Sequence, residues 1–118
     1  MYDLIDQRVR DLPAFEHCTL MRLRRWVHAV SQSLKPPASS SDDPFARAMR
    51  LLDEGSSDDL LIFRPCHETV GESEAILVAL WRLTRADRDV LARELAARLV
   101  GTVRTERLVL AISASLTE

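Results

Sequence analysis

The stretch Pro13–Leu34, PAFEHCTLMRLRRWVHAVSQSL, decides the fold class. Pro13 suits the first turn of an α-helix, where its missing backbone N–H is not needed. Phe15 and Trp26 flank an apolar stripe that emerges when successive residues are placed about 100° apart. The stripe consists of Leu20, Leu23, Val27, Val30 and Leu34. This pattern predicts one long amphipathic helix.

Helical spacing continues on both sides of this stretch. Upstream, the apolar residues of Tyr2–Arg10 recur at helical intervals, which predicts a shorter first helix. Downstream, four more amphipathic helices are expected. They are Pro44–Gly55, the stretch from a cap at Thr69 to about Leu83, the stretch from a cap at Thr84 to about Val100, and Thr102–Leu116.

Short motifs indicate where these helices begin and end. Asp43 precedes Pro44 as an N-cap would. Thr69-x-x-Glu72 and Thr84-x-x-Asp87 have the spacing of a capping box, in which each side chain accepts from the other residue's backbone N–H. Gly101 suits the C-terminal cap between the last two helices.

The apolar face of each downstream helix is expected to be buried, and the helix that ends near Leu83 has the fewest polar positions. The expected inner residues are Phe45, Ala48, Met49 and Leu52; Ile76, Leu77, Leu80 and Leu83; Val90, Leu91, Leu95 and Leu99; and Leu108, Ala111, Ile112 and Leu116.

The predicted fold is all-α: a compact bundle of five or six amphipathic helices that forms a single helical domain over residues 1–118. The sequence has only three glycines, too few for the many tight turns of a β-barrel or sandwich. Residues 35–44 are a loop by composition. Residues 58–66 are apolar without a period and lead into Pro65, so they are read as an extended connector, with a short helix as the alternative.

Composition limits the classes of function. No apolar run approaches the roughly 20 residues that span a bilayer, and no signal-peptide pattern opens the chain, so a cytoplasmic protein is expected. Lys35 is the only lysine among 16 basic residues, a bias that suggests a GC-rich bacterial genome. The net charge of −2 does not favour nucleic-acid binding. Residues 38–75 nevertheless carry −6, and the segments on either side carry +2 each.

Residues with catalytic or metal-binding chemistry occur only in unfavourable arrangements. His17-Cys18 and Cys66-His67 hold four potential zinc ligands, but adjacent residues on a helix point about 100° apart. A thiol nucleophile and its base rarely come from sequence neighbours. The acidic pairs Asp42-Asp43, Asp53-Glu54 and Asp58-Asp59 lack the EF-hand spacing. We therefore expect no metal, no cofactor and no enzymatic activity.

A helix-turn-helix-like segment at residues 88–112 supports one alternative, a DNA-binding transcriptional regulator. Gly101 would form the turn, and Arg104 and Arg107 could face a phosphate backbone. The second helix is too apolar, however, for a helix that sits in a groove.

The preferred hypothesis is a non-enzymatic module for protein–protein interaction or regulation that acts through the long helix at Pro13–Leu34. Arginine and tryptophan are enriched at the energetic centres of protein interfaces. The candidate partner-binding residues are Met21, Arg24, Arg25, Trp26 and His28. The expected partner is another protein or a second copy of the chain, as a homodimer. The competing interpretation is that the arginines are solvated and that Trp26 is packed inside.

Overall fold

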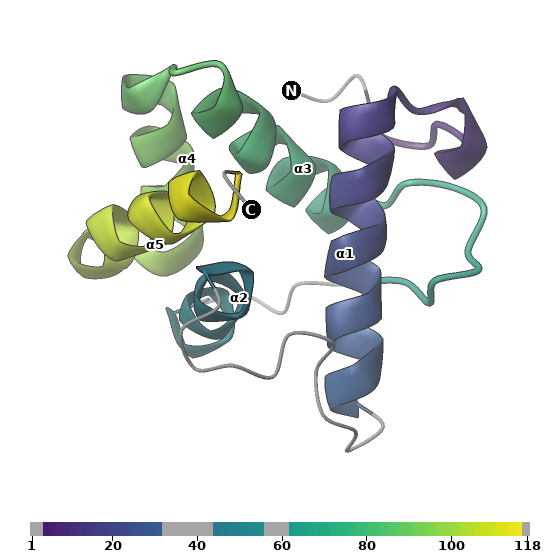
Figure 1. Ribbon diagram of the computed structural model, residues 1–118, viewed down its shortest axis with the longest axis horizontal. Coiled ribbons are helices and arrows are strands. Elements are labelled where there is room, and N and C mark those ends of the chain that lie inside the picture. The colour runs from purple at the N-terminus through teal and green to yellow at the C-terminus, as the bar shows by residue number, and fades with distance from the viewer. Residues whose placement is uncertain (1–3, 32–43, 56–61, 117–118) are drawn as a thin grey trace. The chain divides into compact units, whose positions relative to one another are not determined.

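A computed structural model describes residues 4–31, 44–55 and 62–116, and over these ranges the protein is all-α (Figure 1). Five α-helices and one short 3₁₀-helix are present, and the described ranges contain no β-strand. In chain order they are η1 (Val9–Asp11), α1 (Ala14–Ser31), α2 (Pro44–Gly55), α3 (Glu72–Arg85), α4 (Asp89–Val100) and α5 (Thr102–Ser115). The predicted fold class is confirmed.

The prediction of a first helix at Tyr2–Arg10 is wrong for the residues of this range that the structure describes. Residues 4–6 form a turn with Asp6 at φ +64°, and η1 follows. Two backbone groups of this segment bind a distant one: Asp6 N–H donates to the Val70 carbonyl, and Val9 N–H donates to the Glu68 carbonyl. These long-range bonds use groups that a helix would have needed.

Helices α3 and α4 begin at residues other than the predicted ones. Helix α3 begins at Glu72, and Gly71 occupies the N-cap position that was expected at Thr69. The Glu74 carboxylate accepts from the Gly71 N–H, which is the bond that a glutamate at the third helical position makes in a capping box. Thr84 does not cap α4. Its hydroxyl donates to the Leu80 carbonyl within α3, and α4 begins at Asp89 without a side-chain cap.

The chain divides into two units, and the division falls within α3. Unit 1 is Met1–Pro37 with Leu60–Ala79, and unit 2 is Ala38–Asp59 with Leu80–Glu118. In unit 1, the η1 segment and residues 62–71 run beside α1 (Figure 1). Its buried apolar residues are Leu4, Val9, Leu12, Leu20, Leu23, Trp26, Ala29, Val70, Ala75, Leu77, Val78 and Ala79.

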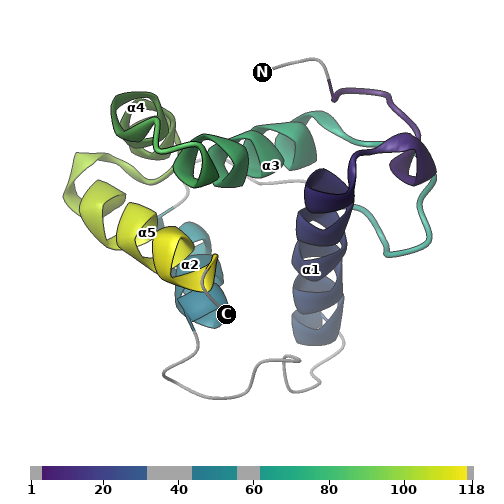
Figure 2. The same ribbon diagram turned by 45° about the horizontal axis from the view of Figure 1, so that its top comes forward.

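In unit 2, α2, α4 and α5 pack against one another, with α5 alongside α2 (Figure 2). The rings of Phe45 and Trp81 lie 5.8 Å apart at 49°, a favourable tilted arrangement. The Trp81 Nε1–H donates to the Ser115 hydroxyl at 3.3 Å, so the buried indole is satisfied. The predicted bounds of α2, the Gly101 cap and the extent of α5 agree with the structure.

The predicted buried face of α4 is wrong in its first turn. Val90 and Leu91 are 69% and 46% exposed, whereas Leu95 is buried as expected. The buried face is completed by small residues, Ala92 and Ala96, which let helices approach closely. Large aliphatic side chains alone therefore do not identify the buried face of α4.

Some predicted features lie outside the described residues. These are Tyr2, Leu34, residues 35–43 of the loop with the Asp43 cap, and residues 58–61 of the connector. The described remainder of the connector, residues 62–66, is neither helix nor strand and ends in a turn at Pro65-Cys66. Among the described helices, none combines the length and apolar character needed to cross a membrane.

Candidate functional site

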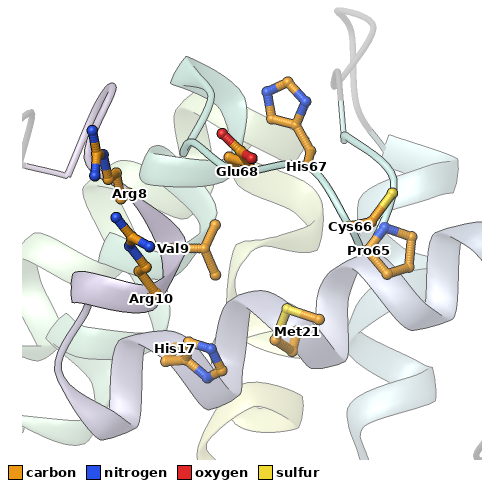
Figure 3. Close-up of a pocket in the computed structure, with 9 residues that line it drawn as sticks. All are labelled: Arg8, Val9, Arg10, His17, Met21, Pro65, Cys66, His67 and Glu68. Atoms are coloured by element: carbon orange, nitrogen blue, oxygen red, sulfur yellow. The ribbon is translucent and has the colours of Figure 1, made fainter.

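A pocket of about 440 Å³ in unit 1 is the best candidate for a functional site. Three chain segments line it (Figure 3). The η1 segment contributes Arg8, Val9 and Arg10, α1 contributes His17 and Met21, and the loop before α3 contributes Pro65, Cys66, His67 and Glu68. Figure 3 shows both arginines on the side opposite Pro65 and Cys66, with Met21 between.

Helix α1 brings His17 and Met21 to the pocket by their four-residue spacing, which places side chains on one face of a helix. The same face continues beyond the pocket through Arg25 and His28. Arg25 is exposed, and Met21 and His28 are partly exposed. Of the five predicted binding residues, these three therefore lie on a common accessible face, which we call the α1 face.

The pocket is lined by two exposed arginines, Arg8 and Arg10. Neither guanidinium makes an ion pair with any residue in the ranges that the structure describes. Among the described residues that line the pocket, Glu68 is the one acidic residue. The lining residues therefore carry net positive charge, and an anionic group could bind between the arginines without displacing a partner from the described part of the chain.

Arg24 holds in place the loop Pro65–Glu68, which forms the wall of the pocket across from Arg8 and Arg10. Its Nε donates to Glu74 Oε2 at 2.7 Å and one terminal nitrogen donates to Glu74 Oε1 at 2.8 Å, a bidentate pair with both side chains 0% exposed. The same guanidinium donates to the backbone carbonyls of His67 at 2.7 Å and Thr69 at 2.8 Å. One arginine thus holds the loop that carries the pocket wall.

Glu74 completes this buried cluster from the α3 side. Besides Arg24, its carboxylate accepts from the backbone N–H of Phe63 at 3.1 Å and of Gly71 at 3.0 Å. Gly71 has no room for a side chain, because a Cβ there would lie 2.6 Å from the Phe63 ring. The loop between Phe63 and Gly71 is consequently anchored at both ends by a single carboxylate.

His67 is held by its neighbours in the loop. Its ring stacks on Phe63 with centroids 3.9 Å apart, and its Nε2 lies 3.3 Å from the Thr69 hydroxyl. In Figure 3 the His67 ring projects away from α1, whereas His17 lies on the helix surface. The two histidines therefore border different parts of the pocket.

The predicted exposure of Arg24 is wrong, and Trp26 is also buried. A partner-binding residue is expected at the surface, but Arg24 is 0% exposed and Trp26 is 9% exposed. Arg24 is four residues after the buried Leu20, so it borders the apolar stripe, and the charge of Glu74 compensates its burial. Neither side chain can take part in a surface contact as the structure stands.

The other residues singled out from the sequence are scattered. Cys18 and Cys66 are both exposed free cysteines, and only Cys66 lines the pocket. Asp53 and Glu54 are exposed at the end of α2; the acidic pairs at 42–43 and 58–59 lie outside the described ranges. Within the part of the chain that the structure describes, no three His, Cys, Asp or Glu residues are arranged to hold a metal ion.

The helix-turn-helix-like segment forms as α4, Gly101 and α5, but its basic residues are separated. Arg104 is partly buried, and its side chain covers Gly55 of α2. Arg107 is exposed on a face that also carries Glu106 and the exposed Val103 and Leu110. This mixed face differs from the continuous basic surface that phosphate contacts require.

Comparison of the chain with protein-family models, with characterised proteins and with solved structures gives no match.

Proposed function

We propose that the protein is a non-enzymatic interaction module that binds an acidic segment of a partner protein in the pocket between η1 and the Pro65–Glu68 loop. The observation that carries the proposal is the pair of exposed guanidiniums, Arg8 and Arg10, on one side of an open pocket, neither of which makes an ion pair with a residue of ranges 4–31, 44–55 and 62–116. Guanidinium groups recognise carboxylates through two parallel hydrogen bonds, which gives direction as well as attraction.

The apolar part of the pocket supports a peptide rather than a free anion. Met21, Val9 and Pro65 line it beside the arginines. An unbranched methionine adapts to differently shaped partners, a property of binding surfaces that accept side chains. A partner segment that alternates acidic and aliphatic residues would place carboxylates on Arg8 and Arg10 and an apolar side chain against Met21.

The α1 face sets the length of the segment. His17 and His28 are eleven residues apart, which is about 16 Å along a helix at 1.5 Å per residue. An extended peptide covers that distance with about five residues at 3.3 Å each. Arg25, beyond the pocket on the same face, would contact a further acidic residue of the segment.

Direct binding of a defined peptide tests the proposal. The probe is a fluorescein-labelled ten-residue peptide of alternating glutamate and leucine, titrated with the protein at low salt and followed by fluorescence anisotropy. We expect the double variant Arg8→Glu/Arg10→Glu to raise the Kd by about tenfold or more, since the two charge reversals together should weaken binding by about 1.4 kcal/mol or more. Binding should also weaken in 1 M salt, where the Debye length falls to about 3 Å.

The matched control is Arg88→Glu/Arg98→Glu, which makes the same change in net charge on exposed residues of unit 2. It should retain the Kd of the unchanged protein. An equal loss of peptide affinity in both double variants would show that only net charge matters and would refute the proposal. Absence of peptide binding by the unchanged protein would also refute it. A peptide with lysine in place of glutamate should not bind.

A further inference from the structure

The outward face of α5 carries an apolar–acidic–basic–apolar pattern. Val103 is 88% exposed and Leu110 is 65% exposed, and the exposed Glu106 and Arg107 lie between them. The positions are spaced i, i+3, i+4 and i+7, so all four side chains share one face of the helix. The opposite face of α5 is buried through residues such as Leu108 and Ile112.

We propose that this α5 face, formed by Val103, Glu106, Arg107 and Leu110, is a docking surface for a second copy of the chain. In the complex, two α5 helices lie antiparallel across a two-fold axis that passes between Glu106 and Arg107. Val103 of one copy then lies against Leu110 of the other, and Glu106 of one copy against Arg107 of the other. Each contact occurs twice, as two-fold symmetry requires.

The arrangement of charge argues for self-association through this face. A two-fold contact brings a surface against itself, so a surface with one sign of charge repels its copy, whereas this face carries one acid and one base at positions symmetric about its centre. Arg107 is exposed and makes no ion pair with the residues that the structure describes.

Helix α4 extends the face. Arg93 pairs with Glu106 at 2.7 Å, with both side chains about half exposed, and Val90 is 69% exposed one turn before Arg93. Exposed apolar side chains rimmed by charges are typical of protein interaction sites. Glu106 would therefore lie between Arg93 of its own copy and Arg107 of the other copy.

Reversal of single charges, followed by mixing, gives a sharp test. Glu106→Arg would place two guanidiniums opposite each other across the two-fold axis, and Arg107→Glu would place two carboxylates opposite each other there. Each variant alone should therefore dimerise at least tenfold more weakly than the unchanged protein in sedimentation equilibrium. An equimolar mixture of the two variants should restore dimers, because one copy then presents two guanidiniums to the two carboxylates of the other.

Two further variants separate this surface from a general effect of charge or folding. Val103→Ser/Leu110→Ser should weaken the dimer, and Arg98→Glu, an exposed charge reversal elsewhere on α4, should leave it unchanged; helical circular dichroism should be the same in all. A monomer at every accessible concentration of the unchanged protein would overturn the proposal. So would single variants that remain dimeric, or a mixture that fails to recover dimers. Peptide binding to unit 1 is measured separately, so the two proposals can fail independently.

Discussion

At the residue scale, the buried pair of Arg24 and Glu74 dominates unit 1. Burying two charges is costly, and it is tolerated only where the charges pair and their remaining hydrogen-bonding groups are satisfied. Here both conditions hold, since Arg24 also donates to the carbonyls of His67 and Thr69 and Glu74 also accepts two backbone N–H groups. Through these bonds the Arg24–Glu74 pair holds the backbone of the loop that forms one wall of the candidate pocket.

Removal of the Arg24–Glu74 pair should destabilise the protein and weaken peptide binding to the pocket. Arg24→Ala leaves the Glu74 charge buried and two carbonyls without donors, and we expect it to lower the free energy of unfolding by about 3–5 kcal/mol in urea denaturation. Arg24→Lys should recover only part of this loss, because an ammonium cannot form the bidentate pair.

The neighbouring exposed arginine provides the control for that measurement. Arg25→Ala removes the same functional group from an exposed position and should change the free energy of unfolding by no more than about 0.5 kcal/mol. Arg25→Ala should still weaken binding of the acidic peptide. Similar stability losses in the two alanine variants would show that the buried pair contributes nothing particular.

At the element scale, the one-residue connection between α4 and α5 depends on its glycine. Gly101 has φ +82° and ψ 165°, a region of backbone conformation that is essentially restricted to glycine. Its N–H donates to the Ala97 carbonyl, so it both ends α4 and precedes α5. A Cβ at this position would meet nothing within 4 Å, so the constraint is the backbone alone.

We therefore expect Gly101→Ala to lower the free energy of unfolding by about 1–3 kcal/mol through backbone strain, with no steric clash. Chemical denaturation followed by circular dichroism measures the effect, with Ser113→Ala on the exposed face of α5 as a neutral comparison. A Gly101→Ala variant as stable as the unchanged protein would mean that the connection adopts a different backbone conformation.

At the scale of the whole molecule, α3 belongs to both units. Its first half buries residues such as Leu77 in unit 1, and its second half buries Trp81 in unit 2. A helix is cooperative, since each residue added to it depends on the turn already formed. Disorder at one end of α3 should therefore be transmitted to the other unit, and the two units should unfold together.

The two tryptophans allow this coupling to be measured. In Trp81→Phe, the fluorescence of Trp26 reports on unit 1; in Trp26→Phe, that of Trp81 reports on unit 2. Within each variant, the urea midpoint from fluorescence should coincide with the midpoint from circular dichroism, as a two-state transition requires. Distinct midpoints would show that the units unfold separately and would count against the predicted single domain.

Periodicity by itself predicted most of the elements. The apolar stripes of α1, α2, α3 and α5 lie within the sequence of each helix, and so do local signals such as Pro44, Gly55 and Gly101. Each of these patterns relates residues that are close together in the sequence, so it can be recognised without knowledge of the fold. The pattern also predicted a surface strip of Met21, Arg24, Arg25 and His28, of which Met21, Arg25 and His28 are accessible and Arg24 is buried.

Only the tertiary structure decided the features that depend on distant residues. Arg24 is buried because Glu74, 50 residues away, supplies its counter-charge, and Asp6–Val9 is not an α-helix because residues 68–70 take its backbone hydrogen bonds. The pocket likewise joins three segments that no spacing rule connects. Helical periodicity reports only which side of an element is apolar, whereas burial of a charge or diversion of a backbone bond depends on the partner that folding brings to it.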